Sequence, residues 1–405
     1  MKLLTFSTLF PNAAMPSHGV FVENRLRHLV AGGRVEARVV APVPWFPSSH
    51  PRFGRFAQFA RAPRRETRFG LDVVHPRYLV VPRIGMNVTP LTLALAARPA
   101  LAEAIASGFD FDAIDAHYFY PDGVAAALLA KWFDRPLVVT ARGSDLTQIA
   151  RIATPRRMIR WAADRASAIV TVCSALKDEV RALGVDGDKV EVLRNGVDLA
   201  GFTPIPPATA RARLGLPADA RVVASVGHLI PRKGHELVIA ALAALPAAFS
   251  STTLLIAGSG PEHDALVALA ARLGVADRVR FLGQLAHDRL PTVYSASDAL
   301  VLASSNEGWA NVLLEAMACG TPVVATDVGG SREVVDAPEA GVLVAQRDSA
   351  TIGVALAGLL AALPDRAATR RYAERFSWDE TTRGQESLFA SLRDLPQNLS
   401  LGVAR

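Results

Sequence analysis

Short apolar runs alternate along most of the chain with longer segments whose apolar residues recur every three or four positions. The short runs are typical of buried parallel strands, and the periodic segments are typical of the helices that cover them. Repeated units of this kind predict parallel sheets with right-handed crossovers. We expect strands at residues 2–7, 35–41, 72–80, 113–118, 136–140, 168–173, 189–194, 221–227, 252–257, 279–283, 299–303 and 322–326.

The most informative stretch is 304–333, SSNEGWANVLLEAMACGTPVVATDVGGSRE. Its pattern predicts a loop, a helix over 311–318, a stop at Gly320, and a buried strand. Glu307 lies in the loop, and Glu315 lies about two helical turns further on. Both could face a ligand above the carboxyl ends of the strands, where open α/β sheets bind ligands. The alternative is that both are ordinary solvated glutamates.

Length and composition indicate two domains with large cores. A chain of 405 residues is too long for one ordinary core, and half of the residues are apolar. Cys173 and Cys319 are far apart in apolar surroundings, so we expect reduced core thiols of a cytoplasmic protein. The opening residues MKLLTFSTLF fit a first strand better than a secretion signal. The longest charge-free apolar run, 350–363, is shorter than the ~18 to 20 residues of a membrane span.

The net charge of +6 is concentrated in one segment. Between residues 52 and 68 there are six arginines and one glutamate, a net charge of +5, so the rest of the chain carries about +1. Phe53, Phe56 and Phe59 recur there every third residue. This composition favours either a membrane-surface helix or a solvated loop with its aromatic rings turned inward. No nucleic-acid motif accompanies the basic residues, so we expect no nucleic-acid partner.

The sequence resembles a known enzyme family at its most informative stretch. Glu307-Gly308-Trp309, followed by EAMACGTPVVAT from Glu315, resembles the EGFG…EAMAxGxPVVAT signature of retaining glycosyltransferases of family 4, in their teichuronic-acid and exopolysaccharide branch. The resemblance implies the GT-B fold, an α/β fold with two Rossmann-like, doubly wound domains facing across a cleft. We expect an acceptor domain at 1–203, a donor domain at 204–378, and a helix crossing back to the first domain, with a tail, at 379–405.

The resemblance also implies roles for individual residues. Those expected to act in catalysis are His117, Lys233 and Glu307. Those expected to bind the donor are Gly19, Arg232, Lys233, Gly258, Gly260, Leu282, Glu307, Gly308, Asn311, Val312 and Glu315. His228 stands where relatives have an arginine, so Arg232 could substitute for it. Arg142 stands where relatives have a histidine, which leaves the role of its loop open.

The residue chemistry is compatible with these roles. A lysine at a strand-to-helix turn can hold a phosphate as a point charge, and an anion there would offset the unfavourable helix dipole. One carboxylate, Glu315, can accept both hydroxyls of a ribose. Gly258-Ser259-Gly260 is only half of a dinucleotide fingerprint, so a dehydrogenase is the weakest candidate. Asp110-Phe111-Asp112 precedes a strand and is read as a turn. We expect no metal and no cofactor.

The expected activity is transfer of a hexose from a nucleotide sugar, with UDP favoured by the family, to a glycan or polyprenyl-linked acceptor of the cell envelope or an exopolysaccharide. Two alternatives remain open: a sugar-nucleotide epimerase on the same fold, and a non-catalytic scaffold that binds nucleotide sugars. The residues expected to contact the acceptor or an anionic membrane are Arg52, Arg55, Arg61 and Arg64. We therefore expect a cytoplasmic enzyme, peripheral on the inner face of the membrane.

Overall fold

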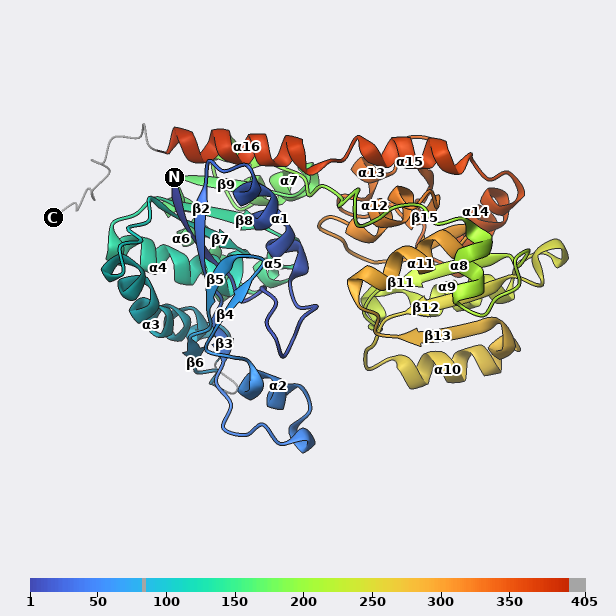
Figure 1. Ribbon diagram of the computed structural model, residues 1–405, viewed down its shortest axis with the longest axis horizontal. Coiled ribbons are helices and arrows are strands. Elements are labelled where there is room, and N and C mark those ends of the chain that lie inside the picture. Colours follow the sequence, from blue (N-terminus) through green and yellow to red (C-terminus); the bar gives the residue numbers. More distant parts are fainter. Residues whose placement is uncertain (82–84, 393–405) are drawn as a thin grey trace. The chain divides into compact units, whose positions relative to one another are not determined.

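The computed structural model describes residues 1–81 and 85–392, with Arg55 described by its backbone only (Figure 1). It contains two compact units. The first comprises Met1–Arg194 and the segment from Asp379 onward, and the second comprises Asn195–Trp378. The chain therefore enters the second unit at Asn195, ahead of the expected boundary after residue 203. The C-terminal helix belongs to the first unit.

The first unit contains an eight-stranded sheet with the order β10-β9-β8-β7-β1-β2-β5-β4, in which only the edge strand β4 is antiparallel to its neighbour. β3 and β6 form a separate parallel pair that continues from the carboxyl ends of β2 and β5. The strands are β1 Lys2–Phe6, β2 Glu36–Val40, β3 Val43–Pro44, β4 Arg65–Arg68, β5 Leu71–Val74, β6 Arg77–Tyr78, β7 Ala113–His117, β8 Leu137–Ala141, β9 Ala168–Thr171 and β10 Val190–Val192.

Helices cover the sheet of the first unit. On one face, Leu26 and Leu29 of α1 share a core with Leu388 and Phe389 of α16. Helices α3, α4 and α6 pack against one another and against strands of the same sheet. The helices are α1 Val20–Ala31, α2 Arg55–Arg61, α3 Gly85–Ala106, α4 Val124–Phe133, α5 Ser144–Thr147, α6 Ala153–Arg165, α7 Ser174–Ala182 and α16 Trp378–Ser391.

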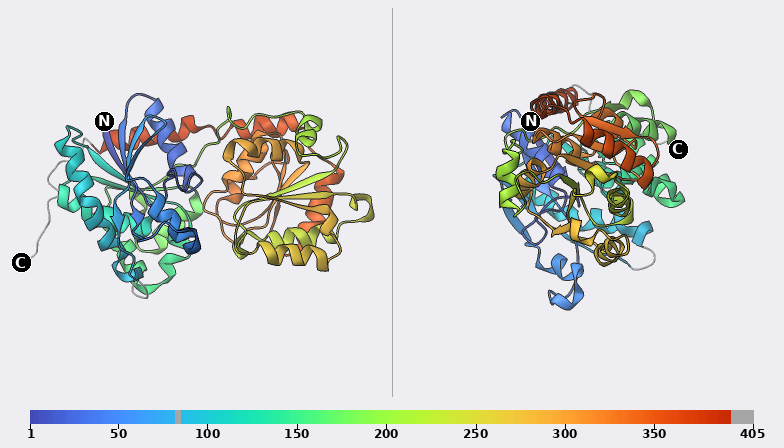
Figure 2. Two further views of the ribbon diagram at one scale, coloured as in Figure 1. Left: turned by 60° about the horizontal axis from the view of Figure 1, so that its bottom comes forward. Right: turned by 90° about the vertical axis from the view of Figure 1, so that its right-hand side faces the viewer.

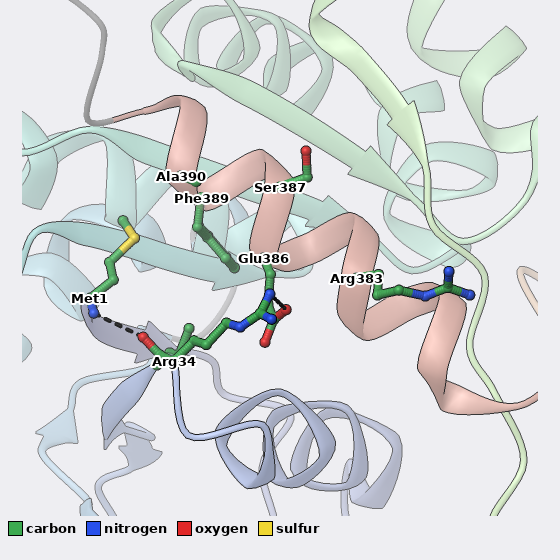
Figure 3. Close-up of a pocket in the computed structure, with 8 residues that line it drawn as sticks. Met1, Arg34, Arg383, Glu386, Ser387, Phe389 and Ala390 are labelled. Atoms are coloured by element: carbon green, nitrogen blue, oxygen red, sulfur yellow. Dashed lines mark hydrogen bonds and ion pairs between the residues drawn. The ribbon is translucent and has the colours of Figure 1, made fainter.

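The packing of α16 leaves a shallow hollow of about 410 Å³ beside the start of β1 (Figure 3). Arg34 and Glu386 form an ion pair there at 3.0 Å, and the amino group of Met1 donates to the carbonyl oxygen of Arg34 at 2.9 Å. The hollow lies at the amino ends of β1 and β2. It is therefore at the opposite edge of the sheet from the carboxyl ends, where the predicted site residues follow their strands.

The second unit contains a fully parallel six-stranded sheet with the order β13-β12-β11-β14-β15-β16. Its strands read as apolar runs because both faces are buried. The strands are β11 Val222–Val226, β12 Thr253–Ala257, β13 Val279–Gly283, β14 Ala299–Leu302, β15 Val323–Thr326 and β16 Gly341–Val344.

Both faces of this second sheet carry helices (Figure 2). Helices α9, α10 and α14 bury one apolar face against the strands in a single core. Helices α8, α11, α12 and α15 pack against one another in pairs. The helices are α8 Pro207–Arg213, α9 His235–Ala243, α10 His263–Arg272, α11 Leu290–Ala296, α12 Asn311–Ala318, α13 Ser331–Val334, α14 Ser349–Ala361 and α15 Arg366–Glu374.

In each sheet the first strand of the chain lies inside the sheet, because later strands are added on both sides of it. In the first unit β1 lies between β2 and β7, and in the second unit β11 lies between β12 and β14. The loops that leave such neighbouring strands diverge to opposite faces of the sheet, and open α/β sheets bind ligands in the resulting space. We therefore expect the functional side chains to lie at the carboxyl ends of β1 and β7 in the first unit, and of β11 and β14 in the second.

Several expectations change in detail. The expected strand at 72–80 is broken into β5 and β6 at His75-Pro76, and three strands (β3, β4 and β16) were not anticipated. Cys173 and Cys319 are buried and are not joined in a disulfide. Asp110 pairs with Arg135, and the Asp112 carboxylate accepts from the backbone of Lys2 at 2.7 Å, as befits a turn.

One helix in the described part of the chain meets a length and composition test for a membrane span. Among the described residues, α3 is by length and composition able to cross a membrane: it has 22 residues, and its most apolar 18-residue stretch has a mean hydropathy of 1.2. Its sequence contains no long charge-free run, because Arg98 and Glu103 interrupt its apolar residues. Helix α14 and the segment 366–391 satisfy the same test only as one span bent by 114°. Helix α3 packs on α4 and α6 as a helix of the first unit.

We expect Phe389→Ala to destabilise the first unit, because Phe389 of α16 is 1% exposed within that unit's core. Truncation of a buried phenylalanine costs about 3–5 kcal/mol. Urea denaturation followed by circular dichroism measures the loss. Val354→Ala, at a side chain that is 76% exposed, is the control and should change little. Equal stability of the two variants would contradict the assignment of α16 to this core.

Candidate active site

The loops that follow β11 and β14 bring a lysine and a glutamate together. After β11 the chain forms a short turn at Pro231–Lys233 before α9, and after β14 it forms the loop that leads to α12. β11 and β14 are neighbours, so both loops lie at one edge of the sheet. Lys233 Nζ donates to Glu307 Oε1 at 2.5 Å, and the two side chains are 15% and 9% exposed. This ion pair is the centre of the candidate site.

Further groups hold the Glu307 carboxylate. The buried Ser304 hydroxyl donates to Glu307 Oε1 at 2.6 Å. Arg232 Nη1 donates to the carbonyl oxygen of Asn306 at 2.8 Å and lies 4.0 Å from Glu307 Oε2. Among the described residues, Oε1 therefore has two donors, whereas Oε2 has only the guanidinium 4.0 Å away. Because each carboxylate oxygen accepts two hydrogen bonds, Oε2 retains capacity for hydroxyl groups of a ligand.

The loops at this edge touch one another through their main chains. A Cβ at Gly258 would lie 1.8 Å from the carbonyl oxygen of Gly227, and a Cβ at Gly329 would lie 1.7 Å from that of Glu307. Both glycines have positive φ, 153° and 52°, which other residues rarely adopt. Gly260 is similarly close to Leu229. Close packing of the loops is thus a sufficient reason for Gly258 and Gly260, and their contact with a donor stays a prediction.

Glu315 lies in α12 within a second polar group of the same unit. The Tyr294 hydroxyl donates to Glu315 Oε2 at 2.9 Å, and His287 Nε2 lies 3.2 Å from Oε1. Burial raises the pKa of Tyr294 well above its usual value, so this hydroxyl stays protonated and donates. The hydrogen bond with Glu315 raises the pKa of His287. The structure places Glu315 with these two residues rather than in contact with Lys233 or Glu307.

The other residues predicted to bind the donor are spread along the same edge of the second unit, except Gly19. Asn311 begins α12, Gly308 precedes it and Val312 follows; all three are partly exposed. Leu282 is partly exposed in β13, and His228 is exposed in the loop after β11. Gly19 lies in the first unit at the start of α1, where a Cβ would meet the backbone of Leu9 at 2.3 Å.

His117 ends β7 of the first unit, and its ring is buried. Arg142 Nη2 donates to His117 Nδ1 at 2.7 Å, and His117 Nε2 lies 3.2 Å from Asp115 Oδ2. A ring that accepts at Nδ1 is neutral and carries its proton on Nε2. Burial lowers the pKa of His117 to about 4, and the charge of Arg142 acts in the same direction. Both ring nitrogens thus have protein partners, and the imidazole is 1% exposed.

Arg142 and Asp145 shape the loop that follows β8. The buried Asp145 carboxylate accepts from the backbone N–H groups of Gly143 at 2.7 Å and Phe119 at 2.9 Å, so it joins this loop to the one after β7. Arg25 is also buried there, and burial lowers its pKa to about 10, so it is charged at neutral pH. After burial, the positive charges of Arg142 and Arg25 also lower the pKa of His117, which favours a neutral ring.

The basic segment contains the helix α2, and its aromatic rings form a cluster. Phe46 packs on Phe53 and Phe56 at ring-centroid distances of 5.3 and 5.4 Å, and Phe59 lies 6.1 Å from Phe56. The helix is therefore present, with Phe59 partly buried and Phe56 49% exposed, and the membrane-surface interpretation stays a prediction. Arg52, Arg61 and Arg64 are exposed, and the Arg55 side chain lies outside the described residues.

Sequence reasoning missed Ser304, Tyr294, His287 and Asp115. Asp115 gave a usable signal, because a carboxylate in the middle of an apolar strand needs a partner. Tyr294 and His287 gave none, since each reaches Glu315 from an element about twenty to thirty residues earlier. The described residues include no group of three or more histidine, cysteine, aspartate or glutamate side chains arranged to hold a metal.

Comparisons with known proteins agree with this architecture. Residues 208–376 match the family model "Glycosyl transferases group 1", and residues 76–200 match "Glycosyltransferase Family 4". The D-inositol 3-phosphate glycosyltransferase of Salinispora arenicola is 37% identical over 313 residues, which cover 70% of this chain and 69% of that protein. The enzyme of the same name from Frankia alni is 36% identical over 308 residues, covering 68% and 72%.

Solved structures share the fold at lower identity. The sucrose-phosphate synthase of Thermosynechococcus elongatus has a TM-score of 0.79 at 23% identity, covering 98% of this chain and 99% of that one. The Anabaena protein HepE, solved in complex with UDP, has a TM-score of 0.72 at 22% identity, covering 96% and 100%. The fold is thus GT-B, and the chain belongs to glycosyltransferase family 4. It is a glycosyltransferase.

We expect Tyr294→Phe to weaken nucleotide binding if Glu315 holds the ribose, as the resemblance implies. The variant removes one donor to a charged acceptor, which is worth about 1.5 kcal/mol, or roughly tenfold in Kd. Isothermal titration with UDP measures it. Tyr372→Phe is a matched control, since this buried tyrosine bonds Val334 and Asp336 rather than Glu315. Unchanged affinity in Tyr294→Phe would separate Glu315 from the nucleotide.

We expect the His117 ring to remain neutral down to about pH 4, well below the usual 6.5. Long-range ¹H–¹⁵N correlation spectra should show a proton on Nε2 and none on Nδ1 at neutral pH. Arg142→Gln keeps a donor for Nδ1 but removes a positive charge, so protonation becomes easier and the pKa of His117 should rise. A wild-type ring that titrates near 6.5 would contradict the burial and pairing described above.

Proposed function

We propose that this glycosyltransferase transfers a hexose from a nucleotide sugar, with UDP as the leaving group, and that the second unit binds the donor. The Lys233–Glu307 pair carries this proposal. It places a cation and a carboxylate with spare acceptor capacity at the carboxyl ends of β11 and β14, where α/β sheets bind ligands. The UDP and UDP-glucose complexes of HepE, which shares the fold, support the choice of donor.

In the proposed reaction Lys233 binds the diphosphate. An ammonium group has three donors, so it can keep its bond to Glu307 while it donates to phosphate oxygens. Arg232 adds a second cation nearby, and the N-terminus of α9 adds backbone amides. These groups neutralise the charge that develops as the diphosphate leaves, which makes a metal unnecessary in the proposal. Glu307 Oε2 accepts from hydroxyls of the sugar, and Glu315 accepts from the ribose.

Retention of configuration is also part of the proposal. The bond between the anomeric carbon and the diphosphate oxygen breaks, and the bond to the acceptor oxygen forms on the same face of the sugar. The departing phosphate oxygen takes the proton of the acceptor hydroxyl. No protein nucleophile is required. The sequence motif from Glu307 to Thr326, shared with retaining enzymes, supports this pathway.

For the acceptor we propose a glycan or polyprenyl-linked glycan of envelope or exopolysaccharide synthesis, used by a cytoplasmic enzyme that is peripheral on the membrane. The exposed arginines Arg52, Arg61 and Arg64, with Arg55 in the same segment, support an anionic or membrane-bound acceptor. The names of the curated relatives favour a second candidate, a small phosphorylated polyol such as inositol 3-phosphate. Both have a hydroxyl nucleophile close to phosphate.

We expect Lys233→Ala and Glu315→Ala each to lower kcat/KM by about 100-fold or more, as the loss of a charged, desolvated contact worth ~3 kcal/mol would. Release of UDP or GDP from a panel of sugar nucleotides, with glycan-lipid and polyol-phosphate acceptors compared, measures the activity. Glu339→Ala, an exposed glutamate of the same unit, is the control.

Three outcomes would contradict the proposal. Near-normal turnover in either variant would remove the assigned roles. NMR of the donor incubated without acceptor would reveal an epimerase if the sugar is converted. Nucleotide-dependent thermal stabilisation without turnover of any donor would indicate a binding scaffold.

A further inference from the structure

The first unit carries an unusual concentration of exposed apolar side chains. Of the fifteen large apolar side chains exposed in the described part of the chain, eight lie between residues 45 and 95, and all of these except Phe69 are 43–57% exposed. We refer to these others as the apolar patch: Trp45, Phe56, Leu79, Val80, Met86, Leu91 and Leu95. Single exposed apolar residues are ordinary, but a contiguous group of this kind marks an interaction surface.

Contacts between the elements show that the patch is contiguous. The Phe46 ring joins α2 to the start of the patch by packing on Phe56 at 5.4 Å. The backbone N–H of Trp45 donates to the carbonyl oxygen of Tyr78 at 2.7 Å, which sets Trp45 beside Leu79. Thr92 Oγ1 then donates to the carbonyl oxygen of Leu79 at 2.8 Å and ties this strand end to α3.

Helix α3 supplies the rest of the surface. Its inner face is buried at Pro90, Leu93, Ala94, Ala97, Leu101 and Ala104. Leu91 and Leu95, one turn apart, lie on the first half of its outer face, which is apolar, and Arg98 and Glu103 follow on the second half. Only 33% of the most apolar 18-residue stretch of this helix is buried within the protein. A helix that is apolar on its outer face as well as its inner face lacks a cover on the outer side.

Arginines without carboxylate partners adjoin the patch. Arg65 pairs with Glu103, and Arg68 pairs with Glu23. Among the described residues no ion pair with a carboxylate involves Arg52, Arg61 or Arg64, all of which are exposed. Arg61 is fixed by the carbonyl oxygen of Ser49 at 2.8 Å. An apolar surface beside unpaired cations matches an anionic bilayer, in which acyl chains lie below negative headgroups.

The geometry points to insertion of the apolar patch into the headgroup region of an anionic membrane, with Arg52, Arg61 and Arg64 on the lipid phosphates. This deepens the membrane part of the proposed function, which was based on the arginines alone. β3 and β6 extend from the carboxyl ends of β2 and β5, so the patch lies on the same edge of the sheet as Gly19 and His117. Membrane binding would therefore bring that edge toward lipid-linked molecules.

Vesicle co-sedimentation without any sugar donor tests the inference independently of glycosyl transfer. Vesicles of phosphatidylcholine that contain about 30 mol% of the anionic lipid phosphatidylglycerol are compared with vesicles of pure phosphatidylcholine. We expect the protein to bind the anionic vesicles, and Leu91→Ser/Leu95→Ser and Arg52→Gln/Arg64→Gln each to weaken binding about tenfold. Val354→Ser/Leu363→Ser, which changes exposed apolar residues of the second unit, should bind like wild type.

Tryptophan fluorescence distinguishes insertion from adsorption. The emission of Trp45, which is 51% exposed, should shift to shorter wavelength on binding and be quenched by brominated lipid. Trp45→Phe should bind but lose that response.

Failure of the wild type to bind anionic vesicles would overturn the inference. So would full binding by Leu91→Ser/Leu95→Ser, because adsorption by charge alone would then suffice. A wild-type dimer that becomes monomeric in Leu91→Ser/Leu95→Ser, without vesicle binding, would show that a second copy of the chain covers the patch. Thermal unfolding of each variant confirms that it is folded.

Discussion

The Lys233–Glu307 ion pair depends on the order of strands in the second unit, and the candidate chemistry depends on the pair. Each charge is largely removed from water, so each would be costly without the other. The two residues are 74 positions apart and meet only because β14, the fourth strand of the unit in sequence, lies directly beside the first, β11. The same strand order leaves space at the carboxyl edge for a ligand. Fold and site therefore have one cause.

The two units place their charges differently. In the second unit Lys233 keeps 15% and Glu307 9% of its side chain exposed, and the donors found among the described residues bond one oxygen of the carboxylate. In the first unit Arg25, Asp115 and His117 are fully enclosed, and Arg142 donates to the His117 ring. A guanidinium is planar and always charged, so at this position it both orients the His117 ring and opposes its protonation. These enclosed and mutually bonded side chains have the properties of a rigid support, and they lack the exposure of a group that reacts with a ligand.

The sequence predicts the fold of the second unit well because its signals are local. The helix at Asn311–Ala318 has the predicted bounds, and all of the expected strands of this unit are present, since doubly buried strands are apolar runs. The sequence is less informative where a strand is exposed. β4 has the sequence RETR at a sheet edge, and no apolar pattern marks it. His75-Pro76 breaks the expected strand at 72–80 because proline cannot continue a ladder.

The site is predictable to the extent that its residues lie in motifs. Lys233, Glu307 and Glu315 could be selected from short patterns, whereas their partners could not. Ser304 and Tyr294 matter through distances that depend on how separate elements pack. The apolar patch was invisible for the same reason, because an apolar residue in a sequence does not reveal whether a neighbouring element covers it. Only Phe56 and the arginines beside the patch gave a sequence signal.

The contacts of Gly258 and Gly329 belong to a row of main-chain contacts that runs across four adjacent strands. Gly258 meets Gly227, Gly234 meets Ala303, and Gly329 meets Glu307, so the loops after β12, β11, β14 and β15 support one another in turn. Such loops have little freedom left to lose when a ligand arrives, which limits the entropic penalty of association. A shift at any one of them would also be transmitted to its neighbours through atoms already in van der Waals contact. We therefore expect the four loops at this edge of the sheet to move together.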